Sequence, residues 1–183
     1  KAEAERKAKI EAEQKVVTKV PEKERVVKVD AVKPAETHAE RPDSEGLSGE
    51  FASNKGRLPW PVDKGTVVSR FGTNSHPILN ITTQNSGVDI SSYKGAQVRA
   101  VFEGKIQGVI AIPGGNKSVL VSHGSYYSVY TNLSSVSVSK GDTVKRGQSL
   151  GIIDTTPNGE TIMNFQVWSG ATKQNPALWV AGM

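Results

Sequence analysis

A short turn holds two residues whose spacing suits metal binding, although one of them is a poor zinc ligand. Residues 84–90 read QNSGVDI, so Asn85 and Asp89 are four positions apart and a turn can direct both side chains at one point. A carboxylate is a good ligand for zinc or a hard cation, whereas a neutral asparagine amide is a poor ligand for zinc. The spacing therefore indicates a metal-binding turn in which one ligand is missing.

Other ligand types are scarce in this chain. It has three histidines and no cysteine, which excludes disulfides, thiol catalysis and cysteine-based zinc sites. One of the histidines, His38, lies in the stretch PAETHAERPDSEG, whose composition is typical of a flexible linker. We expect that side chain to be solvated.

The chain divides into two regions of different composition. Residues 1–16 are nearly all strong helix formers with alanine at most apolar positions, so we predict a helix over 1–20 that ends a coiled coil. Pro21 stops that helix, and 21–46 reads as a flexible linker. A globular domain is predicted over 47–183. Because the chain opens KAEAERKAKI without a starting Met, we expect a fragment or mature portion of a longer protein.

The domain is predicted to be all-β, with two packed sheets or a flattened barrel. Apolar or alternating runs of strand length recur between turn residues, among them TVVSRFG, QVRAVFEG, SVLVSHG and TIMNFQVW. Pro113 to Asn116 predict a hairpin turn. NPALWV near the end predicts one turn of helix or an extended seal with Trp179 packed inward. No apolar run approaches the eighteen residues of a membrane span.

The segment VSKGDTVKRGQSLGIID predicts a tight double turn, because glycines bracket its two short strands. Swinging-arm carrier domains and barrel-sandwich hybrids use this KGDxVxxGQ pattern, and KGAQVRAVFEGKI at 94–106 is a fainter internal copy. A carrier presents a lysine at a hairpin tip, usually beside Met or Asp. Neither Met163 nor Met183 has that setting, so the pattern predicts the scaffold and not the carrier function.

The charge is unevenly distributed along the chain. Residues 1–50 hold 11 basic and 12 acidic residues, which leaves 12 basic and 6 acidic residues in the remainder. A mildly basic domain can attract nucleic acid, anionic envelope polymers or an acidic partner. No basic stripe interleaved with aromatic residues is present, so we predict no nucleic-acid binding. Arg70, Lys94 and Lys105 are candidates for steering an acidic partner.

Seven blocks occur in an order that resembles one known family. They are GRLPWPVDKGTVVSRFG (56–72), HPIL (76–79), NSGVDI (85–90), GAQVRAVFEGKI (95–106), VLVSHGSYYSVYTNLS (119–134), KGDTVKRGQSLG (140–151), and NFQVW with NPALW (164–168 and 175–179). Together they resemble a LytM-type domain, the fold of the lysostaphin-like zinc endopeptidases that cut peptidoglycan cross-bridges. The resemblance covers nearly all of 56–180.

The resemblance also indicates which catalytic parts are absent. Active members supply a histidine and an aspartate around the first turn, a histidine before Leu-Ser, and a later His-x-His. These residues hold zinc with one open position and move protons. At the matching positions this chain has Asn85, Asp89, Asn132, Ile162 and Asn164. We therefore predict no enzyme activity, no metal and no cofactor.

The vacated site is predicted to serve as a binding groove. Its floor is expected to hold Asn85, Asp89, Asn132, Ile162 and Asn164, because asparagine still hydrogen-bonds without carrying a titratable proton. Arg70, His76 and Tyr130 are predicted as groove wall. The resemblance places His76 and His123 outside the ligand set, where each would hydrogen-bond a turn or the wall. A rearranged zinc site of His76, His123 and Asp89 is the weaker alternative.

Silent LytM-type domains attached to coiled coils resemble the EnvC-like murein hydrolase activators of bacterial cell division. That resemblance implies a partner N-acetylmuramoyl-alanine amidase, with peptidoglycan as a second partner, in the periplasm of a Gram-negative bacterium. The N-terminal coiled coil would connect to a membrane division complex. A peptidoglycan-binding module that only positions other proteins is the alternative function. A further hypothesis is that the helix folds back over the groove and blocks it, so that deleting 1–45 raises activation.

Overall fold

The computed structural model describes residues 42–76, 81–112 and 115–183. The predicted helix over 1–20, its possible contact with the groove, and residues 21–41 of the predicted linker lie outside this part of the chain. The first described element is the helix α2, Pro42–Ser53. It begins inside the stretch assigned to the linker, five positions before the predicted start of the domain.

Short strands and one 3-10 turn make up the rest of the described chain. Their bounds are β1 Thr66–Ser69, β2 Gly72–His76, β3 Ile81–Asn85, β4 Val88–Ser91, β5 Gln97–Arg99, β6 Gly104–Ala111, β7 Lys117–His123, β8 Tyr126–Val136, β9 Thr143–Val144, β10 Ser149–Ile153, β11 Ile162–Ser169, β12 Thr172–Gln174 and η1 Pro176–Leu178. The all-β prediction is therefore confirmed.

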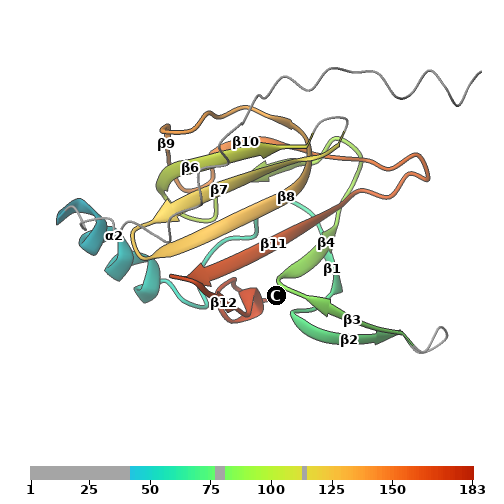
Figure 1. Cartoon of the computed structure of the whole chain (residues 1–183), viewed down its shortest axis with the longest axis horizontal. Helices are drawn as coiled ribbons and strands as arrows, with labels where there is room; N and C mark the ends of the chain where they lie inside the picture. The colour runs from blue at the N-terminus through green and yellow to red at the C-terminus, as the bar shows by residue number, and fades with distance from the viewer. Residues whose placement is uncertain (1–41, 77–80, 113–114) are drawn as a thin grey trace, which may run out of the picture. The chain divides into compact units, whose positions relative to one another are not determined.

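One antiparallel sheet forms the front of the domain. Its main path runs β1-β4-β11-β8-β7-β6-β9, and β12 pairs with β11. In Figure 1, β11, β8, β7 and β6 lie side by side across the view, with α2 at one end of them. The hairpin of β2 and β3 is a separate two-stranded sheet. The predicted hairpin between β6 and β7 is confirmed by their antiparallel pairing.

β8 connects the front sheet to a second, shorter layer. Its first half pairs with β7 and β11, while Leu133 to Val136 pair with β10, which also pairs with β5. The change of partners occurs around Asn132, whose φ of 67° is left-handed. Asparagine adopts this conformation more readily than other residues with a side chain. The expected arrangement of two packed sheets, or a flattened barrel, results from this bend.

The internal repeat predicted from the two KG-containing segments is present in the structure. Gly95 and Gly141 take positive φ angles of 81° and 99° at equivalent turns. After each turn a short strand begins, with Val98 and Val144 fully buried. Strand β5 pairs with β10, and β9 pairs with β6, so each copy is completed by a strand from the other half of the domain.

α2 belongs to the domain because its side chains complete the core. Phe51 is fully buried, and its ring stacks on that of His123 with centroids 4.5 Å apart. Ser48 Oγ accepts a 2.7 Å hydrogen bond from the Ser125 backbone N–H between β7 and β8. Trp179, 3% exposed, lies 5.1 Å from Phe51 between ring centroids, as the expected inward packing requires. Hydrophobic burial of Phe51 therefore holds α2 against the core of the domain.

Candidate functional site

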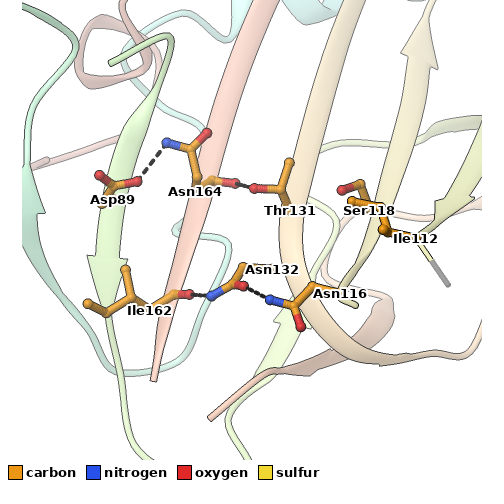
Figure 2. A pocket seen from close by; sticks show the side chains of 8 residues that line it. All are labelled: Asp89, Ile112, Asn116, Ser118, Thr131, Asn132, Ile162 and Asn164. Carbon is orange, nitrogen blue, oxygen red and sulfur yellow. Dashed lines mark hydrogen bonds between the residues drawn. The ribbon is translucent and has the colours of Figure 1, made fainter. Parts of the chain in front are cut away.

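An open cleft of about 410 Å³ lies where the ends of four strands and one hairpin meet. Cross-strand pairing sets its floor, because Asn164 on β11 lies opposite Asp89 on β4 and Thr131 on β8. Figure 2 shows the side chains that line it: Asp89, Ile112, Asn116, Ser118, Thr131, Asn132, Ile162 and Asn164. The cleft thus contains four of the five residues predicted for the groove floor, and the fifth lies beside it.

A glycine lets the two strands carrying the floor approach each other. A Cβ atom on Gly87 would lie 2.2 Å from the backbone oxygen of Phe165. Real Cβ atoms do not approach backbone that closely, so any larger residue at position 87 would push β4 away from β11. The GVD part of the sequence motif is therefore needed to place Asp89 opposite Asn164.

Two asparagine amides hold the surviving carboxylate. Asn85 Nδ2 donates to Asp89 Oδ2 at 2.9 Å, and Asn164 Nδ2 donates to Asp89 Oδ1 at 2.7 Å. Asn164 Nδ2 also donates to Asn85 Oδ1 at 2.9 Å, which closes a ring of three side chains. We call Asn85, Asp89 and Asn164 the amide ring. Amide hydrogens thus occupy the side of the carboxylate at which a metal ion would bind.

Further hydrogen bonds fix Asn85 beneath the cleft. Its Oδ1 accepts from the backbone N–H of Gly87 at 3.0 Å, which is the local turn favoured by asparagine. Its Nδ2 also donates to Ser69 Oγ at 3.1 Å, at the end of β1. Asn85 is therefore oriented from three sides, with its amide nitrogen directed at Asp89.

Asn132 forms a second bridge across the cleft. Its Nδ2 donates to the Ile162 backbone oxygen, and its Oδ1 accepts from Asn116 Nδ2 (Figure 2). These bonds join β8 to β11 on one side and to the β6–β7 hairpin on the other. The left-handed backbone at Asn132 gives this residue a structural role that is independent of any lost chemistry.

A row of polar side chains leads from the amide ring along β11. Gln166 Nε2 donates to Asn164 Oδ1 at 2.8 Å, and Trp168 Nε1 donates to Gln166 Oε1 at 3.0 Å. At the end of the row Lys173 Nζ lies 5.4 Å from the centroid of the Trp168 ring and donates to Ser86 Oγ at 2.7 Å. The alternation of strand side chains places Asn164, Gln166 and Trp168 on the same face as the cleft.

Hydrocarbon side chains line both sides of this polar floor. Ile162 is half-buried on the β11 side, and Ile112, which is 63% exposed, lies on the side of the β6–β7 hairpin. Of the cleft-lining residues in the described part of the chain, Asp89 carries the charge and the others are neutral. The cleft therefore combines two aliphatic walls with a floor of hydrogen-bonding groups and one carboxylate.

Tyr130 is not part of the groove wall, contrary to the sequence-based prediction. Its side chain is fully buried, and its hydroxyl accepts from the Val101 backbone N–H at 3.0 Å. Burial raises the pKa of Tyr130 to about 12, against the opposing effect of its bonds to Ser128 and Val101. The alternation of β8 directs Tyr130 into the core while its neighbour Thr131 faces the cleft.

His123 also belongs to the core, so the alternative zinc site of His76, His123 and Asp89 is wrong. Its ring is fully buried, with Nδ1 2.6 Å from the Glu103 carbonyl oxygen and Nε2 2.8 Å from Ser128 Oγ. Both nitrogens are thus engaged, and a carbonyl only accepts, so Nδ1 carries the proton. Desolvation lowers the pKa of His123 to about 4, although the bond to Glu103 raises it slightly.

The two other predicted wall residues lie on the chain that leads to the hairpin of β2 and β3. Arg70 is exposed and follows Ser69, the residue that contacts Asn85. It is not among the side chains that line the cleft. His76 is the last residue of β2. The part of Arg70 and His76 in binding stays a prediction.

Four residues of the cleft were not predicted from the sequence. Ile112 and Asn116 flank the β6–β7 hairpin turn, and Ser118 and Thr131 are on adjacent strands. A signal for Asn116 was present, because the turn that contains it was recognised. Its position opposite Asn132 depends on the register of β7 against β8, which includes an irregularity between Lys117 and Val119 that no sequence pattern reveals.

The donor set of this site does not fit zinc. The amide ring offers one carboxylate and two amides, and the N–H groups of both amides point at that carboxylate. Zinc in proteins takes thiolate, imidazole and carboxylate ligands, and a catalytic site needs three of them. In the described ranges no group of three His, Cys, Asp or Glu side chains is placed to hold a metal. Reaction steps through a metal are therefore not supported by these residues.

The chain is similar to both peptidoglycan enzymes and murein hydrolase activators. The model of Peptidase family M23 matches residues 83–176. The peptidoglycan DD-endopeptidase ShyB of Vibrio cholerae is 31% identical over 62% of this chain and 27% of its own length. The murein hydrolase activator EnvC of Escherichia coli is 27% identical over 98% of this chain and 42% of its own. The chain thus spans less than half of either relative.

Solved structures agree on the fold. The crystal structure of a zinc-containing peptidase from Vibrio cholerae has a TM-score of 0.57 at 25% identity, over 67% of this chain and 40% of that one.

The described helices of the present chain include none that is long and apolar enough to cross a membrane. Similar proteins thus include both a peptidase and an activator, and the site residues must decide between them.

Proposed function

The chain belongs to peptidase family M23, and from this premise we propose that its domain is a non-catalytic activator of peptidoglycan amidases. The observation that carries the proposal is the amide ring, in which Asn85 and Asn164 donate to Asp89. A site that no longer suits zinc, yet keeps a formed cleft with directed polar groups, is better suited to binding than to hydrolysis. The similarity to EnvC, itself named a murein hydrolase activator, supports the same conclusion.

In this proposal the cleft holds a segment of the amidase that otherwise blocks the amidase active site. A short helix or strand can place aliphatic side chains against Ile112 and Ile162 and meet the polar floor with a few hydrogen bonds. Activation follows if the segment binds this cleft more tightly than it binds the amidase, because only a difference in affinity shifts the equilibrium. The domain contributes no catalytic group.

The wider setting belongs to the same proposal. We place the protein in the periplasm of a Gram-negative bacterium, acting in cell division and daughter-cell separation. Residues 1–20 would form the end of a coiled coil that connects the domain to a membrane division complex. Neither a cofactor nor nucleic acid has a part in this function.

The test is a dye-release assay in which labelled peptidoglycan is incubated with candidate amidases, with and without this protein. We expect the rate of hydrolysis to rise at least about tenfold with a cognate amidase. A full shift from a blocked to an open active site could raise the rate more than this. Ile162→Arg should abolish the rise, because a long charged side chain fills the cleft. The protein alone should release no dye.

A matched control separates the cleft from the rest of the surface. Leu178 in η1 is 58% exposed and lies outside the cleft lining. Leu178→Arg makes the same chemical change at a distant site and should leave activation unchanged. Equal loss in both variants, or no activation of any amidase by the wild-type protein, would contradict the proposal.

The second candidate function is a peptidoglycan-binding module without an activating role. The excess of basic over acidic residues beyond position 50 favours it, since an anionic wall polymer attracts such a surface at low salt. Co-sedimentation with purified sacculi measures that binding. Strong sedimentation combined with no amidase activation would select this function over the first.

A further inference from the structure

The carboxylate of Asp89 has bonding capacity that the protein itself does not use. A carboxylate offers about four lone-pair positions, and the two amides of the amide ring occupy one position on each oxygen. Asp89 is half-buried and lines the cleft, so a ligand in the cleft can reach its carboxylate. Figure 2 shows the carboxylate at the end of the cleft floor, beside Asn164.

Within the described part of the chain, no positive side chain is paired with this carboxylate. The ion pair found among these residues is elsewhere, between Arg99 and Asp63 at 2.9 Å. Lys117 lies between the cleft residues Asn116 and Ser118 in the sequence, and Arg70 follows Ser69, but neither basic residue lines the cleft. The charge of the cleft is therefore opposite in sign to that of the basic domain around it. Asp89 is half-buried, so its carboxylate is less well hydrated than one on an open surface and gains more free energy from a nearby cation.

We propose that the ligand of the cleft inserts an ammonium or guanidinium group at Asp89, flanked by aliphatic groups that contact Ile112 and Ile162. This inference rests on the proposed function and makes it more specific. The occupant is a peptide segment of the amidase that carries a lysine or arginine between aliphatic residues.

The size of the cleft supports a single inserted side chain with its neighbours. About 410 Å³ is within the range of pockets that enclose a small ligand, and it is too small for a folded surface. A charge-assisted hydrogen bond is stronger than a neutral one and restricts direction, so one basic group would also fix the register of the segment. Thr131 and Ser118 line the same cleft and carry hydroxyl groups, of which that of Thr131 already donates to the Asn164 carbonyl oxygen at 3.3 Å.

A direct test uses short peptides and needs no amidase. The side-chain amide signals of Asn85 and Asn164 are followed by NMR while acetylated, amidated tripeptides are added: Leu-Lys-Leu, Leu-Arg-Leu, Leu-Gln-Leu and Leu-Glu-Leu. We expect both basic peptides to shift these signals, and the Gln and Glu peptides to bind at least about tenfold more weakly. Equal binding of the Gln peptide, or no shift with either basic peptide at millimolar concentration, would overturn the inference.

Two comparisons, which use three variants, separate charge from shape. Asp89→Asn removes the charge and should reduce binding of the Lys peptide to that of the Gln peptide. Because this substitution also alters the amide ring, a second comparison leaves Asp89 in place. Ile162→Lys should fill the site with its own ammonium and prevent binding of the Lys peptide, whereas the neutral Ile162→Gln should retain at least part of it. Equal loss in both Ile162 variants would show that shape alone matters and would refute the role of charge.

The same variants distinguish this inference from the proposed function. If wild-type protein activates an amidase and Asp89→Asn activates it equally, the basic group is wrong and the activator function stands. If the basic peptides bind through Asp89 but no amidase is activated, the site chemistry is right and the activator function fails.

Discussion

Two clusters lie against the front sheet, and they differ in burial and in chemistry. At the α2 end is the buried cluster of Phe51, His123, Ser128 and Tyr130, which are all fully buried. At the other end is the amide ring, whose members are half-buried beside the cleft. The buried cluster keeps its imidazole and phenol. The amide ring keeps one carboxylate and otherwise holds only neutral amides.

The contrast separates a buried imidazole that supports the fold from a carboxylate that is open to a ligand. His123 is held by Glu103, Ser128 and the ring of Phe51, so losing it would leave buried polar groups without partners. The cleft imposes no such requirement, because water can replace a lost partner there. The buried cluster should therefore control stability, while the amide ring and its surroundings should control binding. Variants in each cluster test that division.

The largest expected effect is the return of zinc affinity to the amide ring. Replacing both Asn85 and Asn164 by histidine would give Asp89 two imidazole neighbours, which is a catalytic-type ligand set. We expect the double variant to bind zinc with a dissociation constant below about 1 µM and the wild-type protein to bind more weakly than about 1 mM. Competition with a chromophoric chelator measures both.

The single variant Asn85→His is the control, since two ligands hold zinc poorly. Stoichiometric zinc in the freshly purified wild-type protein would show that the division between the clusters is wrong. A double variant that folds but gains no affinity would mean that the strands β4 and β11 no longer hold the side chains at the distances that a metal requires.

Truncation of the buried cluster should have the next largest effect. Phe51→Ala removes a ring that contacts His123, Tyr126 and Trp179. We expect it to lower the free energy of unfolding by roughly 4 kcal/mol, as for other large core truncations. The cleft substitution Ile162→Ala should cost about 1 kcal/mol, because that side chain is only half-buried. Urea denaturation followed by fluorescence measures both, and similar costs would contradict the division.

The sequence predicted the frame of the molecule better than its two clusters. Alternating runs and turn residues identified most strands of the front sheet but not β2, β3 or β12. The repeated KG turns identified two equivalent parts of the fold. These signals are local, so one sequence contains them. The helix α2 was missed because only Phe51 and a few neighbours bury surface, and their partners, His123 and Trp179, are distant in the sequence.

The prediction of the site was incomplete, because the contacts within it depend on how the strands are paired. Family resemblance identified Asn85, Asp89 and Asn164, but the direction of each hydrogen bond depends on the register of β4 against β11. Tyr130 was placed on the wrong face because the bend at Asn132 changes which residues of β8 face the cleft. A shift of one residue reverses the face of every side chain on a strand, and sequence alone does not fix that shift.

Acid should destabilise the domain through the buried cluster. The pKa of His123 is lowered to about 4 in the folded protein, from about 6.5 in the unfolded chain. The unfolded state therefore binds more protons between these values, and the stabilising contribution that is complete above pH 6.5 is lost as the pH falls towards 4. At pH 4.5 we expect a loss of about 2 kcal/mol relative to pH 7.

The measurement is the free energy of unfolding in urea at several pH values. His123→Asn removes the titrating group, so its stability should be lower at pH 7 and should change less between pH 7 and 4.5. If this variant keeps the full pH dependence of the wild-type protein, carboxylates elsewhere are responsible. Titration of the His123 imidazole would then not be the reason why acid destabilises the domain.

The smallest expected effect concerns Asn132. This residue lines the cleft, but its left-handed backbone conformation by itself favours asparagine. Asn132→Gly keeps the left-handed conformation and loses the amide bonds to Ile162 and Asn116. Asn132→Ala loses the same bonds and also strains the backbone, which costs about 1 kcal/mol more. The difference between their free energies of unfolding isolates the backbone effect. If the two variants are equally stable, the backbone does not require asparagine here, and Asn132 belongs with Asn85 and Asn164 as a residue of the binding surface.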